Sequence, residues 1–242
     1  MKLVVLLYQR KSLLFDPLLA AFQRYRIPIH LHAWPTQDLA SALRGLAPLG
    51  LHAAILEDPL LQQQALHLVD RQDPEAQGAG RVDLVLAEHF GLFGNYSEAP
   101  ALASLLRQHA LGLRALWLGP PRPELKGGLK VLAQVSVLAE SYAEGEAWLR
   151  LLPHPQRGRV AVGAVQGAAL AREVDLLIHA GGPLSSILQP YHTVFSLQGL
   201  SQEQLRWGGG YIGPEELRAY RLAHLSEALG YPLPPQAFVI IS

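Results

Sequence analysis

Short, continuous runs of valine, isoleucine and leucine alternate along the chain with longer segments in which apolar residues recur every three or four positions. A short run without alternation is typical of a strand covered on both faces, as in a parallel sheet. The predicted strands are residues 3–7, 27–32, 52–56, 82–86, 115–118, 134–138, 159–162, 176–179 and 194–196. The predicted helices are residues 13–25, 39–46, 59–68, 99–109, 142–151 and 214–229. Strands that alternate with helices predict βαβ units and an α/β fold.

The segment near residues 99–110 lies between two such series of strands, so we place a domain junction there. The last helix has clear boundaries, because Pro214 follows Gly213 at its start and Gly230 follows its end. The three glycines at 208–210 lack the Lys-Ser/Thr of a phosphate loop, and they predict a tight turn before this helix.

The composition narrows the classes of function. The 242 residues include 20 Lys plus Arg and 20 Asp plus Glu, and this zero formal charge argues against a nucleic-acid or anionic-membrane partner. The chain has no cysteine, which excludes disulfides and thiolate chemistry. The apolar run 3–7 is too short to span a membrane and lacks a secretory cleavage site, so we expect a cytoplasmic protein. His30 and His32 share one face of a predicted strand, but no third ligand is apparent and no metal site is expected.

Several motifs occur in a recognisable order and at regular intervals. They are Pro74-Glu75-Ala76, GRVDLV at 80–85, GNYSE at 94–98, ALWLG at 115–119, REVDLLIHA at 172–180 and Gly230-Tyr231-Pro232. In this order they resemble the motifs of shikimate dehydrogenases, the oxidoreductases that serve aromatic amino acid biosynthesis. The resemblance covers most of the chain, although each motif is degraded.

The resemblance implies an N-terminal, mainly parallel α/β substrate domain and a C-terminal Rossmann-like domain, with a central cleft. Residues 1–100 and 214–242 would form the substrate domain, and residues 101–213 a degenerate nucleotide-binding domain. Shikimate dehydrogenases transfer a hydride between shikimate and NADP, while a Lys–Asp pair handles the proton of the hydroxyl group.

The catalytic pair of the family is altered here. Leu61 stands at the position of the lysine, and leucine cannot transfer a proton. Loss of a general acid or base typically costs ~10²–10⁴ in rate. Glu98 stands at the position of the aspartate and is the candidate catalytic residue, with its carboxylate one methylene further out. Ser97 and Glu98 are also an ordinary helix start, with a capping serine and an acid in the first turn.

The resemblance gives Ser12, Asp83, Ser97 and Tyr220 as candidate substrate-binding residues. Ser12 retains the first of two serines that meet the substrate carboxylate. Asp83 replaces an asparagine, and a carboxylate there could accept from a hydroxyl group or serve a structural role at a strand. Tyr220 stands, within one position of register, where the family has a glutamine that contacts substrate.

The candidate cofactor-binding residues are Gly119, Arg122 and Glu140. A dinucleotide loop uses glycines and the N-terminus of a helix to hold the pyrophosphate. Here Gly119 is followed by two prolines, which supply no N–H donors, and Arg122 is left to contact a phosphate alone. Glu140 stands where the family has an arginine against the 2′-phosphate of NADP. It would repel that phosphate and either bind the ribose of NAD or lie solvated.

Three hypotheses follow. The first is a shikimate-dehydrogenase-like protein that is catalytically impaired or non-catalytic, a pseudoenzyme candidate that binds a small hydroxylated carboxylic acid. The second is a divergent but active NAD(P)-dependent shikimate dehydrogenase, for which NADP or NAD would be the cofactor. The third is an interaction or scaffold subunit, as a homodimer or with a paralogue. Three separate losses, of the lysine, the glycine loop and the arginine, favour the first.

Overall fold

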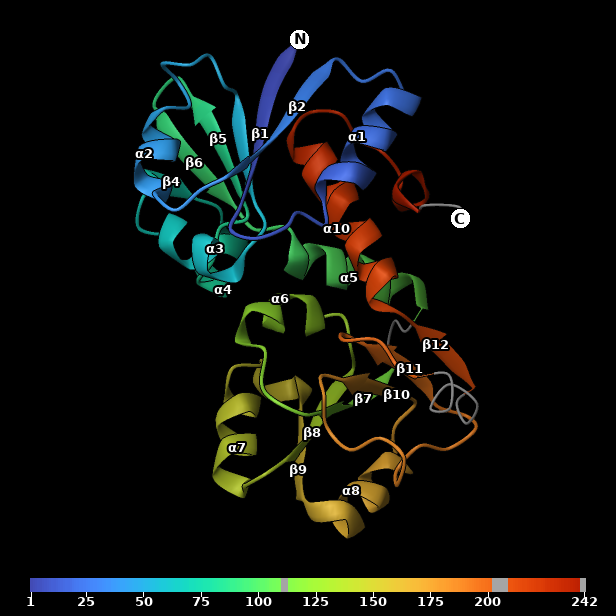
Figure 1. The fold of residues 1–242 in the computed structure, drawn as a ribbon. Helices are drawn as coiled ribbons and strands as arrows, with labels where there is room; N and C mark the ends of the chain where they lie inside the picture. Colours follow the sequence, from blue (N-terminus) through green and yellow to red (C-terminus); the bar gives the residue numbers. More distant parts are fainter. Residues whose placement is uncertain (110–112, 202–208, 240–242) are drawn as a thin grey trace. The chain divides into compact units, whose positions relative to one another are not determined.

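The chain folds into two units, each built around one six-stranded sheet (Figure 1). The structure, a computed structural model, describes residues 1–109, 113–201 and 209–239. Unit 1 consists of Met1–Ala101 with Ala219–Ser242, and unit 2 of Leu102–Arg218.

The chain passes between the units inside two helices, α5 (Glu98–His109) and α10 (Pro214–Ala228). Each unit combines a sheet with helices, so the predicted α/β fold class is confirmed. The helix predicted for residues 99–109 is α5, whose first residue is Glu98.

Unit 1 is built on a mixed sheet with the strand order β2-β1-β3-β5-β6-β4. Its strands are β1 (Lys2–Tyr8), β2 (Ile29–Pro35), β3 (Ala53–Leu56), β4 (Arg71–Gln72), β5 (Leu84–Glu88) and β6 (Gly91–Asn95). β1 is parallel to β2 and β3, and β4 is parallel to β6. β5 is antiparallel to both of its neighbours, so three pairings are parallel and two are antiparallel.

Alternate residues of β1 pack against two different helical layers. Val4 and Leu6 belong to a cluster with α1 (Phe15–Arg24), α10 and the 3₁₀ turn η3 (Pro235–Phe238). Val5 and Leu7 belong to a second cluster with α2 (Leu39–Arg44), α3 (Pro59–Ala65) and α4 (Pro74–Ala79). These four strand residues are at most 1% exposed, which explains why the strand is continuously apolar.

Unit 2 is built on a fully parallel sheet with the strand order β12-β11-β10-β7-β8-β9. Its strands are β7 (Arg114–Leu118), β8 (Gln134–Ala139), β9 (Arg157–Val162), β10 (Leu176–His179), β11 (Thr193–Ser196) and β12 (Gly210–Ile212). From β9 onwards this is the 3-2-1-4-5-6 order of doubly wound sheets, with the reversal between β7 and β10. Such sheets bind ligands outside the carboxyl ends of the strands at the reversal.

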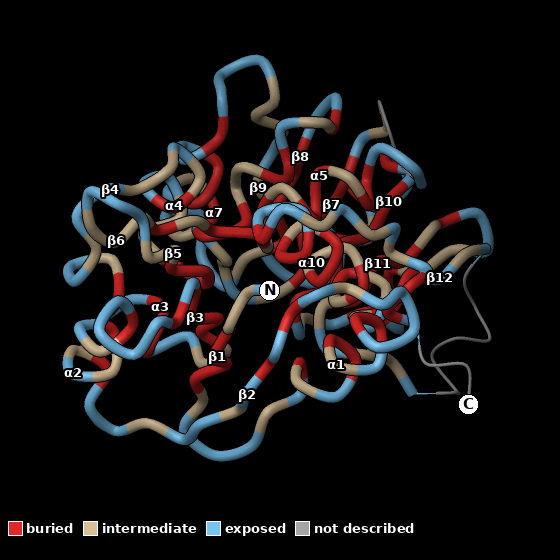
Figure 2. Tube along the Cα trace, turned by 90° about the horizontal axis from the view of Figure 1, so that it is seen from above, coloured by how far each residue is buried: buried red, intermediate tan, exposed pale blue. Residues whose placement is uncertain are grey.

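Both faces of this second sheet are covered. Leu116 and Leu118 of β7 pack with Leu170 of helix α8 (Gly163–Ala171). Trp117 packs edge-on against Trp148 of helix α7 (Tyr142–Arg150), with ring centroids 5.2 Å apart. The turn η1 (Pro123–Leu125), the short helix α6 (Lys126–Leu129) and the turn η2 (His154–Gln156) complete the unit. Figure 2 shows buried residues concentrated in the strands, with exposed residues in the loops.

The hydrophobic pattern does not predict α4, α8, β4, β6 or β12. Helix α8 reads GAVQGAALA, so it has no apolar stripe at helical spacing, and β6 contains two glycines. β4 has two residues and β12 has three, too few for a pattern. β2 begins at Ile29 rather than at residue 27. Gly208, part of the predicted turn, lies outside the described residues, and Gly210 begins β12.

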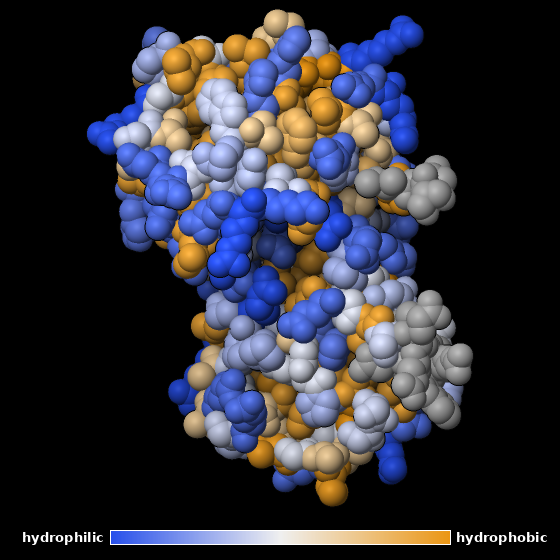
Figure 3. Space-filling view, in the orientation of Figure 1, coloured by the Kyte–Doolittle hydropathy of each residue, from blue (hydrophilic) through white to orange (hydrophobic). Residues whose placement is uncertain are grey.

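None of the helices within the described residues combines the length and apolar character needed to cross a membrane. On the face seen in Figure 3, hydrophilic residues are interspersed with small hydrophobic areas over both units.

We expect the stability of unit 2 to fall as the pH drops below about 6.5, the ordinary pKa of histidine. Burial lowers the pKa of His179 and His192 in the folded protein. The unfolded chain then binds more protons, so stability is complete above the unfolded pKa and is lost as the pH falls toward the folded pKa. The His192 ring is satisfied when neutral, since Nδ1 accepts from the Gln189 N–H at 3.0 Å and Nε2 lies 2.8 Å from the Ala171 carbonyl oxygen.

Urea unfolding at a series of pH values tests this expectation. The variant His192→Asn should flatten the dependence of stability on pH. Equal slopes for His192→Asn and the original chain would contradict the assignment.

Candidate functional site

A buried polar cluster lies at the start of β5 in unit 1. Asp83 is fully buried, and both of its carboxylate oxygens are occupied. Oδ1 accepts from the Ser97 backbone N–H at 2.9 Å, and Oδ2 accepts from the Ser97 hydroxyl at 2.5 Å. Oδ2 also accepts from Arg221 Nε at 3.1 Å. Asp83 therefore ties together β5, the start of α5 and helix α10.

Arg221 contributes a positive charge that the sequence motifs do not reveal. Its side chain is 13% exposed, and its Nη2 atom is buried without a hydrogen-bond partner among the described residues. Burial raises the pKa of Asp83 above its ordinary value, while Arg221 and Ser97 oppose that shift. Burial by itself lowers the pKa of Arg221, but Asp83 and Glu98 together raise it above the ordinary value.

Glu98, the candidate catalytic residue, begins helix α5 close to this cluster. The hydroxyl group of the buried Tyr96 donates to Glu98 Oε2 at 3.0 Å. Asp83, Ser97 and Glu98 are therefore brought together as the resemblance implies, with Tyr96 and Arg221 as additional members.

Leu61, at the position of the family's lysine, lies in the core of unit 1. It is 1% exposed and packs in the cluster that contains Val5 and Leu7 of β1. The next residue, Gln62, is also buried and donates through Nε2 to the carbonyl oxygens of Leu56 and Glu57. This junction between β3 and α3 is filled by packing and backbone hydrogen bonds.

Ser12 lies between β1 and α1 and is bound to an acid from another strand end. Its hydroxyl donates to Glu57 Oε2 at 2.7 Å and accepts from the Phe15 N–H at 3.0 Å. The Leu13 N–H donates to the other oxygen of Glu57, and the neighbouring Asp58 accepts from the Gln9 N–H at 2.7 Å. Two carboxylates that follow β3 therefore hold the loop that contains Ser12.

Tyr220 lies on α10 beside Arg221 and is partly buried. The residue on this helix that contacts Asp83 is its neighbour Arg221. The assignment of Tyr220 to a substrate stays a prediction. The sequence does indicate that Arg221 is buried against a partner, because Leu217, Arg221 and Leu225 are spaced four apart on one helix face. A cation in an apolar row indicates a buried partner of opposite charge.

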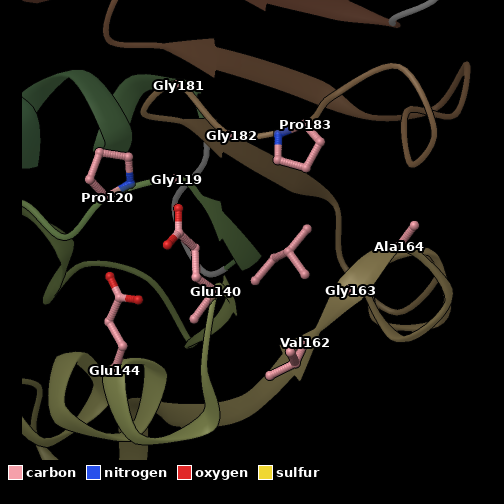
Figure 4. A pocket seen from close by; sticks show the side chains of 12 residues that line it. Gly119, Pro120, Glu140, Glu144, Val162, Gly163, Ala164, Gly181, Gly182 and Pro183 are labelled. Atoms are coloured by element: carbon pink, nitrogen blue, oxygen red, sulfur yellow. The ribbon is translucent and has the colours of Figure 1, made fainter.

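In unit 2 a pocket of about 680 Å³ opens at the reversal of the strand order (Figure 4). Its walls come from the turns that follow β7, β8, β9 and β10. The lining residues are Gly119, Pro120, Leu138, Ala139, Glu140, Glu144, Val162, Gly163, Ala164, Gly181, Gly182 and Pro183. Gly119 and Glu140, both predicted for the cofactor site, are thus brought to one pocket, whereas Arg122 is not part of its lining.

The turns after β7 and β10 touch at two glycines. A Cβ atom on Gly119 would lie 2.6 Å from the Gly182 nitrogen, and a Cβ on Gly182 would lie 2.6 Å from the Gly119 nitrogen. Gly119 also has a φ of +104°, a conformation that favours glycine. The Gly182 N–H is 3.4 Å from the Leu118 carbonyl oxygen. These glycines allow two backbone turns to meet.

No family model and no curated protein matches the sequence. The structure, however, is similar to solved structures of other proteins. The Listeria monocytogenes shikimate 5-dehydrogenase, in complex with shikimate and NAD, aligns with a TM-score of 0.79 and 14% identity over 98% of this chain and 94% of its own. The Thermus thermophilus enzyme, in complex with NADP(H) and shikimate, aligns with a TM-score of 0.76 and 19% identity over 98% and 97%. A shikimate 5-dehydrogenase-like protein aligns at 0.76 and 13% over 98% and 94%. The chain has the shikimate dehydrogenase fold.

This fold raises the question of whether the pocket of unit 2 suits a nicotinamide dinucleotide, as found in the Listeria and Thermus structures. Among the described residues, its lining includes two glutamates and two prolines but no lysine, arginine or histidine. Arg122 donates instead to Glu124, a 5% exposed acid, at 2.5 Å. The helix after the turn, α6, has only four residues. A pyrophosphate needs N–H donors or cations, and the turn after β7, where a doubly wound sheet holds it, supplies two prolines and only a four-residue helix, so this turn does not fit a pyrophosphate.

Proposed function

We propose that this chain is a non-catalytic protein of the shikimate dehydrogenase fold, in which the polar residues of unit 1 serve internal contacts rather than shikimate oxidation. The observation that carries the proposal is the hydrogen bond from Ser12 to Glu57. By resemblance, Ser12 would receive the carboxylate of the substrate. A carboxylate of the protein already holds that hydroxyl, and a second one beside it would be repelled by about 1–4 kcal/mol at surface-like dielectric values.

The acid–base position supports the same proposal. Leu61 is packed in the core and carries no ionisable group. Asp83 accepts three hydrogen bonds from Ser97 and Arg221, which gives it a structural role. Glu98 then lacks the lysine that completes the family's pair. Without a general acid or base, the rate falls by ~10²–10⁴.

A turnover assay tests the proposal. The chain is incubated with shikimate and either NADP or NAD, and reduced nicotinamide is followed by its absorbance, with the Thermus thermophilus enzyme measured alongside. We expect turnover at least about 10²-fold below that enzyme. Comparable turnover would refute the proposal and establish the active-dehydrogenase alternative.

A matched pair of variants tests the role of Glu57. Glu57→Gln removes the charge next to Ser12, whereas Asp58→Asn removes the neighbouring charge, which binds Gln9 instead. We expect shikimate to raise the melting temperature of Glu57→Gln but not that of Asp58→Asn or the original chain. Equal responses of both variants would separate Glu57 from ligand exclusion.

A second candidate function, binding of a small hydroxylated acid without oxidation, is favoured by the Nη2 of Arg221, which has no hydrogen-bond partner within the described part of the chain. A guanidinium nitrogen in this state can donate to a hydroxyl or carboxylate of a ligand. In the melting experiment, a shift of the original chain with shikimate, lost in Arg221→Lys, would place this candidate first.

A further inference from the structure

We propose that the pocket of unit 2 binds a purine nucleoside without phosphate groups, through the carboxylates of Glu140 and Glu144, and that it discriminates against the phosphorylated forms. This inference adds a ligand to the proposed function and does not depend on what happens at Ser12 or Leu61. It rests on the position, size and charge of the pocket.

The position and size suit a nucleoside. The pocket lies at the carboxyl ends of parallel strands at the reversal of strand order, where doubly wound sheets bind ligands. Its volume of about 680 Å³ is within the usual range of small-molecule sites. Leu138, Val162 and Ala164 supply aliphatic surface on which a flat base can pack. The helix α8 begins at Gly163, and the N–H groups of a first helical turn can donate to ring nitrogens.

The negative charge of the pocket lining suits the hydroxyl groups of a nucleoside. Glu140 follows the end of β8, and Glu144 lies in the first turn of α7. Both side chains extend toward the turn of Gly119 and Pro120 (Figure 4). Ionised carboxylates only accept hydrogen bonds, so they match the two donor hydroxyls of a ribose. An acid after the second strand of such a sheet is placed to meet that ribose.

The same two carboxylates disfavour phosphate. They extend toward the turn that would hold a pyrophosphate, and the part of the lining that the structure describes offers no cation in compensation. Pro120 and Pro183 have no N–H to donate. The backbones of Gly119 and Gly182 are in close contact. Although neither residue has a side chain, no room is left for a phosphate between them. Each added negative charge should therefore weaken binding.

Calorimetric titration with adenosine, AMP and NADP tests the proposal. We expect adenosine to bind, AMP to bind about tenfold or more weakly, and NADP more weakly still. The difference between adenosine and AMP should shrink in high salt, because the repulsion comes from charge and is screened. Failure of adenosine to bind, or AMP binding as tightly as adenosine, would overturn the proposal.

Variants of Glu140 provide a second test. Glu140→Gln should weaken adenosine binding and reduce the preference over AMP, and Glu140→Arg should invert that preference. Glu146→Gln is the control, because Glu146 lies on the helix α7 that follows Glu140, next to the pocket residue Glu144, but does not line the pocket. A preference unchanged in both Glu140 variants would overturn the assignment. NADP binding tighter than adenosine binding, without turnover, would overturn this inference alone, whereas turnover of shikimate with NADP or NAD would overturn both this inference and the proposed function.

Discussion

Replacing Asp83 with alanine is expected to destabilise unit 1 by about 3–5 kcal/mol, the usual effect of removing one partner from a buried ion pair. Arg221 would keep its charge at a position where its side chain is 13% exposed and where one of its nitrogens already has no hydrogen-bond partner in the described residues. Ser97 would lose an acceptor for both its backbone N–H and its hydroxyl. Unpaired buried donors each cost about 1–3 kcal/mol, which adds to the effect.

Urea unfolding, with hydrogen exchange of the β5 and β6 amides to identify the unit, measures this loss. Glu88→Ala is the matched control, because Glu88 lies at the other end of β5 and forms an exposed ion pair with Arg71 at 2.6 Å. An exposed pair contributes about 0–1 kcal/mol. The double variant Asp83→Ala with Arg221→Met should recover part of the stability, since it leaves no buried charge. Equal losses for Asp83→Ala and Glu88→Ala would show that the cluster is not a structural centre.

The parts of the fold that the sequence predicts are those whose burial is uniform along an element. β1 is apolar on both faces, because helices cover it on both sides. α8 escapes prediction for the opposite reason, since its alanines and glycines allow it to lie close to the sheet without an apolar stripe. A Cβ on Gly167 would lie 3.0 Å from a Leu138 methyl carbon, which illustrates that closeness.

The candidate site is predicted only in part, because its decisive contacts join distant segments. Ser12 and Glu57 are 45 residues apart, and Asp83 and Arg221 are 138 apart. Motif comparison places Ser12 and Asp83 at positions of interest, but it does not show that another side chain of the same protein already binds each of them. The assignments of these residues to a ligand therefore stay predictions.

The two units differ in how their polar groups are used. In unit 1 the carboxylates of Glu57 and Asp83 accept hydrogen bonds from the protein itself. In unit 2 the carboxylates of Glu140 and Glu144 line an open pocket. An acid that is satisfied internally stabilises the fold, whereas one that faces a pocket is available to a ligand. This contrast is why we assign structural roles in unit 1 and a ligand in unit 2.

Replacing Gly119 with alanine is expected to destabilise unit 2 by about 2–6 kcal/mol, as the sum of two separate effects. The first is backbone strain, because a side chain at a φ of +104° costs about 1–3 kcal/mol. The second is crowding, because the new Cβ would lie 2.6 Å from the Gly182 nitrogen and 2.9 Å from the Ala180 carbonyl carbon. Both atoms belong to the backbone after β10, which cannot move without separating it from β7.

Two other glycines of the same pocket divide the effect into its parts. Gly163 has a φ of +78° with nothing within 4 Å of a Cβ, so Gly163→Ala should show the strain alone. Gly182 has an ordinary φ but meets Gly119 at 2.6 Å, so Gly182→Ala should show the crowding alone. Urea unfolding of the three variants should therefore rank Gly119→Ala as the most damaging. If Gly119→Ala is no less stable than Gly163→Ala, the turns after β7 and β10 can move apart at little cost in free energy. The pocket that they line could then widen to admit larger ligands.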